Sequence, residues 1–165
     1  AMVAAGEIEI AIDELRYLVQ GRLADRFAAA QGITAAADEV AAYRRQVDAA
    51  LARDGLRQAG PSTAEDSAAR EQIAKAFILQ WKINRALHER YGGRIAYQQG
   101  GPEPLDAWRR FLEDSRARGD FRLGDPSLDA PFWRYFVANQ IHSFYPPGSV
   151  AEAQALRTPP WAGVR

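Results

Sequence analysis

Three long segments in the first 95 residues carry apolar side chains at helical spacing, and this pattern restricts the fold more than any other feature of the chain. The segments cover residues 13–30, about 35–54 and about 64–91. In each of them the apolar residues recur every three or four positions, which places them on one face of a helix. Gly32 and the Gly92-Gly93 pair follow the first and third segments, as expected at helix ends. The sequence therefore predicts a mainly α-helical protein.

Proline and aromatic residues mark two further helices in the second half of the chain. Pro102 and Pro104 precede a fourth helix, which carries Leu105, Trp108, Phe111 and Leu112. Pro131 opens a fifth helix, with the sequence PFWRYFVANQIHSF. From residue 146 onward several prolines predict an extended tail over the surface, covering residues 146–165.

Two short segments have the pattern of strands. In EIEIAI, residues 7–12, isoleucine alternates with glutamate and alanine, which is typical of a half-buried strand. RIAYQQ, residues 94–99, lies between two glycine pairs. A lone strand leaves its backbone groups unpaired, so residues 7–12 need a partner strand. The predicted fold is thus mainly α, with about five helices and a small two- or three-stranded β element.

Composition excludes several classes of function. The chain has 165 residues, 21 basic and 21 acidic side chains, and no cysteine. A balanced charge without a basic stripe argues against nucleic-acid binding, and no apolar run approaches the roughly 20 residues of a membrane span. Without cysteine there are no disulfides and no thiolate metal sites. We therefore expect no nucleic-acid partner, no membrane span, no metal and no cofactor.

Residues 3–95 resemble the amino-terminal domain of SurA-like periplasmic chaperones. The resemblance rests on VAAGEIEI, on Glu14-Leu15, and on two longer stretches, RLADRFAAAQGITAAADEVAAYRRQV and REQIAKAFILQWKINRALHERYGGRI. It implies a non-enzymatic, chaperone-like protein of the bacterial periplasm that binds unfolded or extended polypeptide and gains from pairing as a homodimer. A periplasmic location also implies that a signal peptide was removed from the native start. In this family a carboxy-terminal segment completes the amino-terminal domain, which implies that residues 7–12 pair with residues 94–99 or with a strand of the tail.

The resemblance stops near residue 95. In that family a parvulin-type prolyl isomerase domain usually follows, but the remaining 70 residues are too few for one and lack its motifs. Isomerase activity is therefore not expected. The predicted organisation is a SurA-like helical module at residues 3–95, an aromatic-rich helical segment at 96–145 that packs on it, and the tail at 146–165.

Catalytic constellations are not evident in the sequence. His88 and His142 are the only histidines, and both lie near predicted helix ends, where an imidazole can bond the last carbonyls. The carboxylate pairs Asp125/Asp129 and Glu103/Asp106 lie in turns or at helix starts, where acids cap free N–H groups. A structural role is the expectation for all of these residues.

Aromatic side chains are the candidate binding residues. On the fifth helix they point in too many directions for a single buried face, so they either fill the core or line a groove for client segments. Gln98, Gln99, Asn139 and Gln140 would supply neutral hydrogen-bonding groups beside such a groove. The predicted peptide- or ligand-binding residues are Trp81, Tyr97, Trp108, Phe132, Trp133 and Phe136.

Two other functions remain open from the sequence. The aromatic half of the chain is also compatible with a pocket for a small molecule, in a binding protein or a small enzyme. A concave cavity of roughly 300–1,000 Å³ with a few convergent polar groups would favour that function, whereas an open groove would favour the chaperone. The third alternative is an accessory subunit that docks on one specific protein partner.

Overall fold

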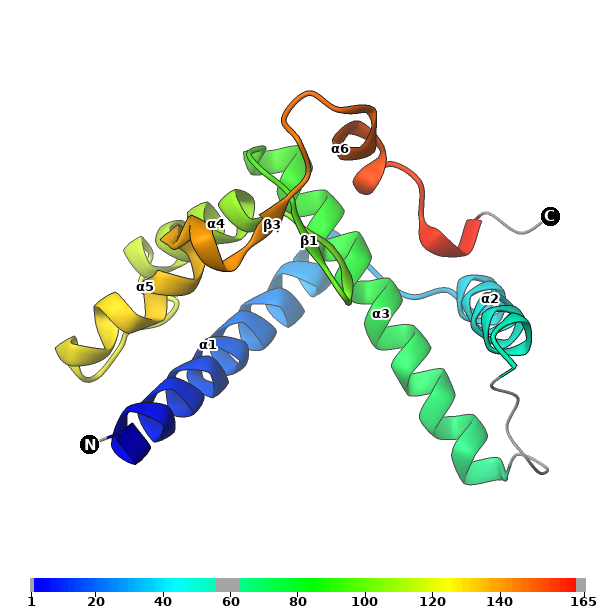
Figure 1. The fold of residues 1–165 in the computed structure, drawn as a ribbon, viewed down its shortest axis with the longest axis horizontal. Helices are drawn as coiled ribbons and strands as arrows, with labels where there is room; N and C mark the ends of the chain where they lie inside the picture. The colour runs from blue at the N-terminus through cyan, green and yellow to red at the C-terminus, as the bar shows by residue number, and fades with distance from the viewer. Residues whose placement is uncertain (1, 56–62, 163–165) are drawn as a thin grey trace.

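The protein is mainly helical and carries one small sheet, as the sequence predicts. The computed structural model describes residues 2–55 and 63–162, with side chains from residue 11 onward. Figure 1 shows α1 (Met2–Gln31) and α3 (Ala64–Tyr91) diverging from a region near the sheet. Helices α4 (Leu105–Ala117) and α5 (Asp129–Val137) lie along α1, and α2 (Ala37–Arg53) lies beside α3.

The strand predicted at residues 7–12 is wrong, because this segment belongs to α1. The isoleucines of this segment alternate with other residues, but Ile8 and Ile12 are also four positions apart, which is the spacing of one helix face. Three alternating residues are too few to separate the two periods. The helix that was predicted from residue 13 to residue 30 is confirmed, and it ends at Gly32, whose φ is +64°.

Local hydrogen bonds fix the starts of α2 and α3. The Glu39 carboxylate accepts a bond from the backbone N–H of Ala36 over 2.8 Å. At the start of α3, the Thr63 hydroxyl accepts from the Asp66 N–H over 3.0 Å, and the Asp66 carboxylate accepts from the Thr63 N–H over 3.1 Å. This reciprocal capping box satisfies two backbone donors that the helix itself leaves free.

The sheet has three antiparallel strands in the order β2-β1-β3. Strand β1 (Ala96–Gln98) confirms the strand predicted within residues 94–99, and it forms a hairpin with β2 (Gly101–Glu103). Its other neighbour is β3 (Ser143–Phe144), with Ala96 opposite Phe144. The predicted pairing of residues 7–12 with this sheet is therefore wrong, and the segment between α5 and the tail supplies the third strand instead.

The carboxy-terminal segment is only partly extended. A 3₁₀ turn (Pro126–Leu128) leads into α5, and a second one (Asn139–Ile141) precedes β3. The fifth helix that was predicted over residues 131–144 is therefore wrong beyond Val137, because its last residues form this turn and pair with β1. The tail, predicted to be extended from residue 146, contains the short helix α6 (Val150–Ala155) and a 3₁₀ turn, η3 (Pro160–Ala162). Ser149 caps α6, since its hydroxyl accepts from the Glu152 N–H over 3.1 Å, and this bond favours a helical start that the prolines alone do not indicate.

Two hydrophobic clusters share α3. The first joins α1, the end of α3, α4 and α5, and its fully buried members include Leu87, Leu105, Leu112, Phe132 and Phe136. The second joins α2, the middle of α3 and the tail, and it contains Val40, Ala74, Ile78, Trp81, Ile95, Leu156 and Trp161. Trp81 meets Trp161 edge to face, with ring centroids 5.3 Å apart. The tail therefore covers one face of α3. In the part of the chain that the structure describes, every helix is too short or too polar to cross a bilayer.

An ion pair joins the end of α3 to the start of α4. Asp106 accepts from the Arg94 backbone N–H, from Nε and from Nη2, each over 2.9 Å. The bonds to Arg94 hold the pKa of the Asp106 carboxyl below its usual value, against the opposing effect of burial. Of the predicted pair Glu103/Asp106, Asp106 therefore has the structural role that was expected.

We expect this ion pair to make stability depend on acid pH. Because the pKa of Asp106 is lower in the folded state, its contribution is complete above the unfolded pKa of about 3.9 and is lost as pH falls through the folded value. Urea unfolding between about pH 5 and pH 2 should therefore show a loss of stability that is shallower in Asp106→Asn. Equal slopes for Asp106→Asn and the wild type would contradict this assignment, and Asp54→Asn on the surface serves as the control.

Candidate functional site

A pocket of about 520 Å³ lies between α1, α3, α4, α5 and the β1–β2 hairpin. We call it the hairpin pocket. Its walls combine five carboxamide side chains, three aromatic rings, one carboxyl group and small residues. They are Tyr17, Gln20, Gly21 and Ala24 of α1, Gln80 and Asn84 of α3, Gln98, Gln99, Gly100, Gly101 and Glu103 of the hairpin, Trp108 of α4 and Tyr135 of α5.

Asn84 anchors one wall of the hairpin pocket. Its Oδ1 accepts from Trp108 Nε1 over 2.8 Å and from Gln80 Nε2 over 2.9 Å, while its Nδ2 donates to the Pro102 carbonyl over 3.0 Å. Asn84 is therefore a buried residue whose amide connects α3, α4 and the hairpin. Such a fully bonded amide fixes the relative position of three elements, because each lost bond would leave a buried polar group without a partner.

Glu103 and Tyr135 form the most strongly perturbed titratable pair of the hairpin pocket. The Tyr135 hydroxyl donates to Glu103 Oε2 over 2.7 Å. Burial raises the pKa of Glu103, and the bond from Tyr135 and the nearby charges of His142 and Arg16 only partly offset it. Burial and the negative charge of Glu103 also raise the pKa of Tyr135. This hydroxyl therefore stays protonated at neutral pH and acts as a donor.

Arg16 and His142 support Tyr135 from outside the pocket wall. The Arg16 guanidinium lies 3.8 Å from the centroid of the Tyr135 ring and forms an ion pair with Asp13. His142 Nε2 lies 2.5 Å from the Tyr135 carbonyl, and because a carbonyl only accepts, this nitrogen carries the proton. His142 Nδ1 then accepts from Gln98 Nε2 over 3.4 Å. The expectation that His142 bonds a carbonyl at the end of the fifth helix is confirmed.

Gly21 offers a direct way to change the hairpin pocket without damaging the fold. It lies within α1, and a Cβ added there meets no atom within 4 Å. Glycine costs roughly 0.5–1 kcal/mol relative to alanine inside a helix. Gly21→Ala is therefore expected to raise the free energy of unfolding by about that amount, measured by urea denaturation. A destabilised Gly21→Ala would contradict this prediction.

The six residues predicted to bind a ligand do not line one pocket. Only Trp108 lines the hairpin pocket. Phe132 and Phe136 are fully buried in the first cluster, and Trp81 is buried in the second. Tyr97 is 64% exposed and packs against Tyr145, while Trp133 is half-buried against Phe132. The aromatic set is therefore mainly core, which was the other reading that the sequence allowed.

Sequence reasoning missed most of the residues that line the hairpin pocket. Of the four neutral hydrogen-bonding groups that it named, Gln98 and Gln99 line the pocket, whereas Asn139 and Gln140 do not. It did not find Gln80 and Asn84, although these amides lie four residues apart in α3. Side chains at that spacing are neighbours on a helix and can bond each other.

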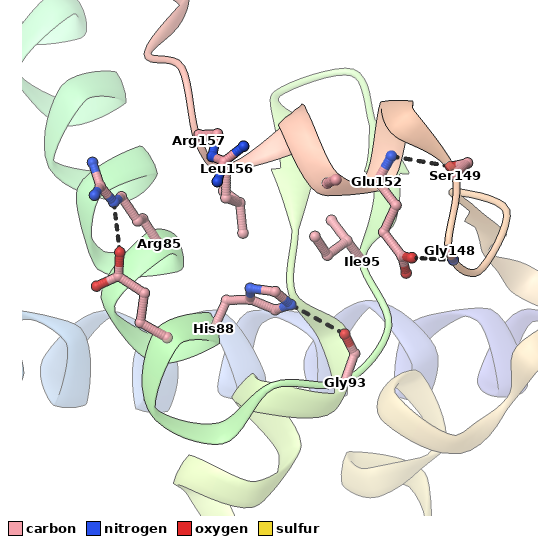
Figure 2. Close-up of a pocket in the computed structure, with 11 residues that line it drawn as sticks. Arg85, His88, Gly93, Ile95, Gly148, Ser149, Glu152, Leu156 and Arg157 are labelled. Carbon is pink, nitrogen blue, oxygen red and sulfur yellow. Dashed lines mark hydrogen bonds and ion pairs between the residues drawn. The ribbon is translucent and has the colours of Figure 1, made fainter.

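A second pocket, of about 600 Å³, lies between α3 and the tail, and its polar groups are largely committed to local structure. Arg85 Nε bonds Glu89 Oε1 over 2.8 Å, and Glu152 Oε2 accepts from the Gly148 N–H over 2.7 Å. His88 Nε2 lies 3.2 Å from the Gly93 carbonyl. Figure 2 shows these bonds as dashed lines. Each of these bonds lies within α3 and its end or within the tail, and the contacts that hold the tail near α3 are those of the second cluster. We therefore assign this pocket a structural role.

A third hollow, of about 410 Å³, lies between α2 and α3. We call it the α2–α3 groove. It is lined mainly by the apolar side chains Tyr43, Val47, Leu51 and Ile73, with Arg44, Asp48 and Arg70 at its margin. Ile73 is 64% exposed and Val47 is 38% exposed.

Neither metal nor sequence comparison points to a particular chemistry. Within residues 2–55 and 63–162, no three histidine or acidic side chains gather closely enough to hold a metal ion. No protein-family model, curated protein or solved structure matches this chain.

Proposed function

We propose that this protein binds a small polar organic ligand, without covalent chemistry, in the hairpin pocket. One observation carries the proposal: amide side chains from α1, α3 and the hairpin converge on a concave space of about 520 Å³. That volume lies within the range of roughly 300–1,000 Å³ that small-molecule sites usually occupy. Carboxamides both donate and accept hydrogen bonds, so they suit a ligand that is rich in polar groups.

The wall of the hairpin pocket is also rigidly held, which favours binding. The bonds of Asn84 and the Glu103–Tyr135 pair connect four elements around the space. A wall that is already ordered loses little conformational freedom when a ligand enters. Gln20 and Gln99 also line the pocket, and we expect their amides to adapt to the ligand.

The experiment is a binding screen monitored by nuclear magnetic resonance. The collection contains sugars, polyols, amides, amino-acid amides and amines, each at millimolar concentration. The reporters are the indole N–H of Trp108, identified with Trp108→Phe, and the carboxamide signals of Asn84 and Gln98. We expect a subset of compounds to shift these signals selectively.

Gly21→Phe supplies the decisive variant, and Gly21→Ala is its matched control. A phenyl ring at position 21 occupies space in the pocket, whereas a methyl group leaves most of that space free. Binding should disappear in Gly21→Phe and persist in Gly21→Ala, with both proteins folded. Absence of any binder, or binding that Gly21→Phe leaves unchanged, would overturn the proposal.

Polypeptide binding is the second candidate, and the α2–α3 groove is the observation that favours it. Its apolar side chains are open to solvent, and exposed apolar surfaces of this kind can hold extended segments. The groove belongs to the part of the chain that resembles SurA-like chaperones. On this proposal the protein acts as a periplasmic chaperone, and weak sites gain avidity when two copies pair.

Light scattering tests this second candidate. An outer-membrane protein is refolded with the wild type, with Ile73→Glu, and with Ile141→Glu as a control at another exposed apolar position. The chaperone proposal expects dose-dependent suppression of aggregation that only Ile73→Glu abolishes. A wild type that suppresses nothing at large molar excess, or equal activity in all three proteins, would exclude the groove from this role.

A further inference from the structure

The hairpin pocket contains a single group that can carry charge at neutral pH. Among its lining residues Glu103 is the only acidic side chain, and none is Arg, Lys or His. The remaining polar groups are neutral amides, the two tyrosine hydroxyls and the Trp108 indole. A ligand in this space therefore meets one carboxyl group and no opposing positive charge in the wall.

Glu103 also has no ion-pair partner within the described chain. Its carboxyl bonds the Tyr135 hydroxyl and the Gln98 amide, and both of these partners are neutral. The nearest basic groups that face it are Arg16 of α1 and His142 beside β3. Arg16 is paired with Asp13, and His142 is bonded to the Tyr135 carbonyl and to Gln98.

The Glu103 carboxyl therefore lacks a positive charge paired with it among the described residues. Tyr17 of α1 and Tyr135 of α5 are the other titratable side chains that face Glu103, and neither supplies a positive charge. Because burial outweighs the opposing effects of Tyr135, His142 and Arg16, the pKa of Glu103 rises. A cation placed beside the carboxyl would reverse this effect and favour the ionised form.

The aromatic rings in the wall of the hairpin pocket also favour a cationic ligand. Tyr17, Trp108 and Tyr135 all line the pocket, and the faces of aromatic rings attract ammonium and guanidinium groups. Tyr135 already carries the Arg16 guanidinium at 3.8 Å on its ring, which shows that one face of this ring holds a cation. Carboxyl, rings and amides thus favour an organic cation that also bears neutral hydrogen-bonding groups.

We propose that the ligand of the hairpin pocket is an organic cation, an amine or guanidinium compound whose positive group pairs with Glu103. This inference rests on the proposed small-ligand function. The amides of Gln20, Gln80, Gln98 and Gln99 bond the uncharged part of the ligand, while Glu103 selects its charge. Binding releases the proton of those molecules in which Glu103 is protonated.

Matched pairs of compounds test the charge of the ligand. The full-length protein is titrated with cadaverine and 1,5-pentanediol, with benzylamine and benzyl alcohol, and with the methylamides of N-acetyl-lysine and N-acetyl-norleucine. The Trp108 indole signal reports occupancy of the pocket. At pH 7 we expect at least one cation to bind roughly tenfold tighter than its neutral partner, a difference that corresponds to about 1.4 kcal/mol.

Variants assign this preference to Glu103. Glu103→Gln should bring the affinities of each pair to within about twofold, whereas Glu89→Gln, which removes an exposed acid from the other pocket, should leave the preference unchanged. If Glu103→Gln does not fold, the wild type still provides the test. The ¹³C signal of the Glu103 carboxyl should then move toward its ionised position as the cation binds.

The outcomes separate the two proposals. Neutral compounds that bind as tightly as their cationic partners would overturn the cation proposal and leave the hairpin pocket as a binding site. A Glu103 carboxyl signal that does not respond to a bound cation would overturn it as well. If no compound of either kind perturbs the pocket signals, both proposals fail.

Discussion

Phe132→Ala is expected to lower the free energy of unfolding by about 4 kcal/mol, within the range of roughly 3–5 kcal/mol for truncation of a buried phenylalanine. Phe132 is fully buried in the first cluster. Its ring lies 5.1 Å from that of Trp133 and 5.8 Å from that of Phe121, measured between centroids. Truncation removes the transfer energy of the ring and leaves a cavity between α1, α4 and α5, which costs dispersion contacts on every side.

Chemical denaturation measures this loss, and Val137→Ala on the same helix is the control. Val137 is 52% exposed, so its truncation should change stability by no more than about 0.5 kcal/mol. A Phe132→Ala protein as stable as Val137→Ala would show that α5 does not pack on the core as described. The aromatic residues of α5 would then again be candidates for a binding groove.

Gly93→Ala is expected to lower the free energy of unfolding by a similar amount to Phe132→Ala, for a different reason. A Cβ built at Gly93 would lie 2.5 Å from the Cβ of Asp106, a separation that forces one of the two backbones to move. Gly93 also has a φ of +92°, which an L-amino acid adopts only under strain. Strain of roughly 1–3 kcal/mol and overpacking of roughly 1–3 kcal/mol together predict a loss of about 4 kcal/mol.

Gly32→Ala is the matched control for this substitution. Its φ of +64° is also positive, but an added Cβ meets no atom within 4 Å. It should cost only roughly 1–2 kcal/mol, the cost of the left-handed conformation alone. Urea denaturation of both variants separates the two contributions, and equal losses would show that the Gly93–Asp106 contact does not limit stability.

The long helices could be predicted from the sequence because their signals are local. Apolar spacing, capping residues and glycine ends all lie within the segment that they define, and α2, α3 and α4 formed where these signals indicated. The strand predicted at residues 7–12 was wrong because Ile8, Ile10 and Ile12 fit both the strand period and the helix period over so short a stretch. The third strand, Ser143–Phe144, is two residues long, and its position depends on β1, which lies more than 40 residues earlier.

The hairpin pocket could be predicted only in part, since its residues are distant in sequence. Gln98 and Gln99 were identified as neutral bonding groups, but nothing near Glu103 in the sequence indicates that Tyr135 will donate to it. Tyr135 lies 32 positions after Glu103, with α4, a 3₁₀ turn and the start of α5 between them, so the contact depends on how α5 packs. The burial of Phe132 and Phe136 could not be predicted for the same reason, because it depends on how α5 packs against α1 and α4.

The position of α3 between two clusters has a consequence for synthesis on the ribosome. The residues of α1 and α2 that pack against this helix precede it, but α4 and α5, which complete the cluster around Ile83 and Leu87, follow it, and Trp161, which covers Trp81, comes last. A nascent chain must therefore emerge almost entirely before both apolar faces of α3 are fully shielded. During that interval the uncovered parts of the helix favour aggregation with neighbouring nascent chains.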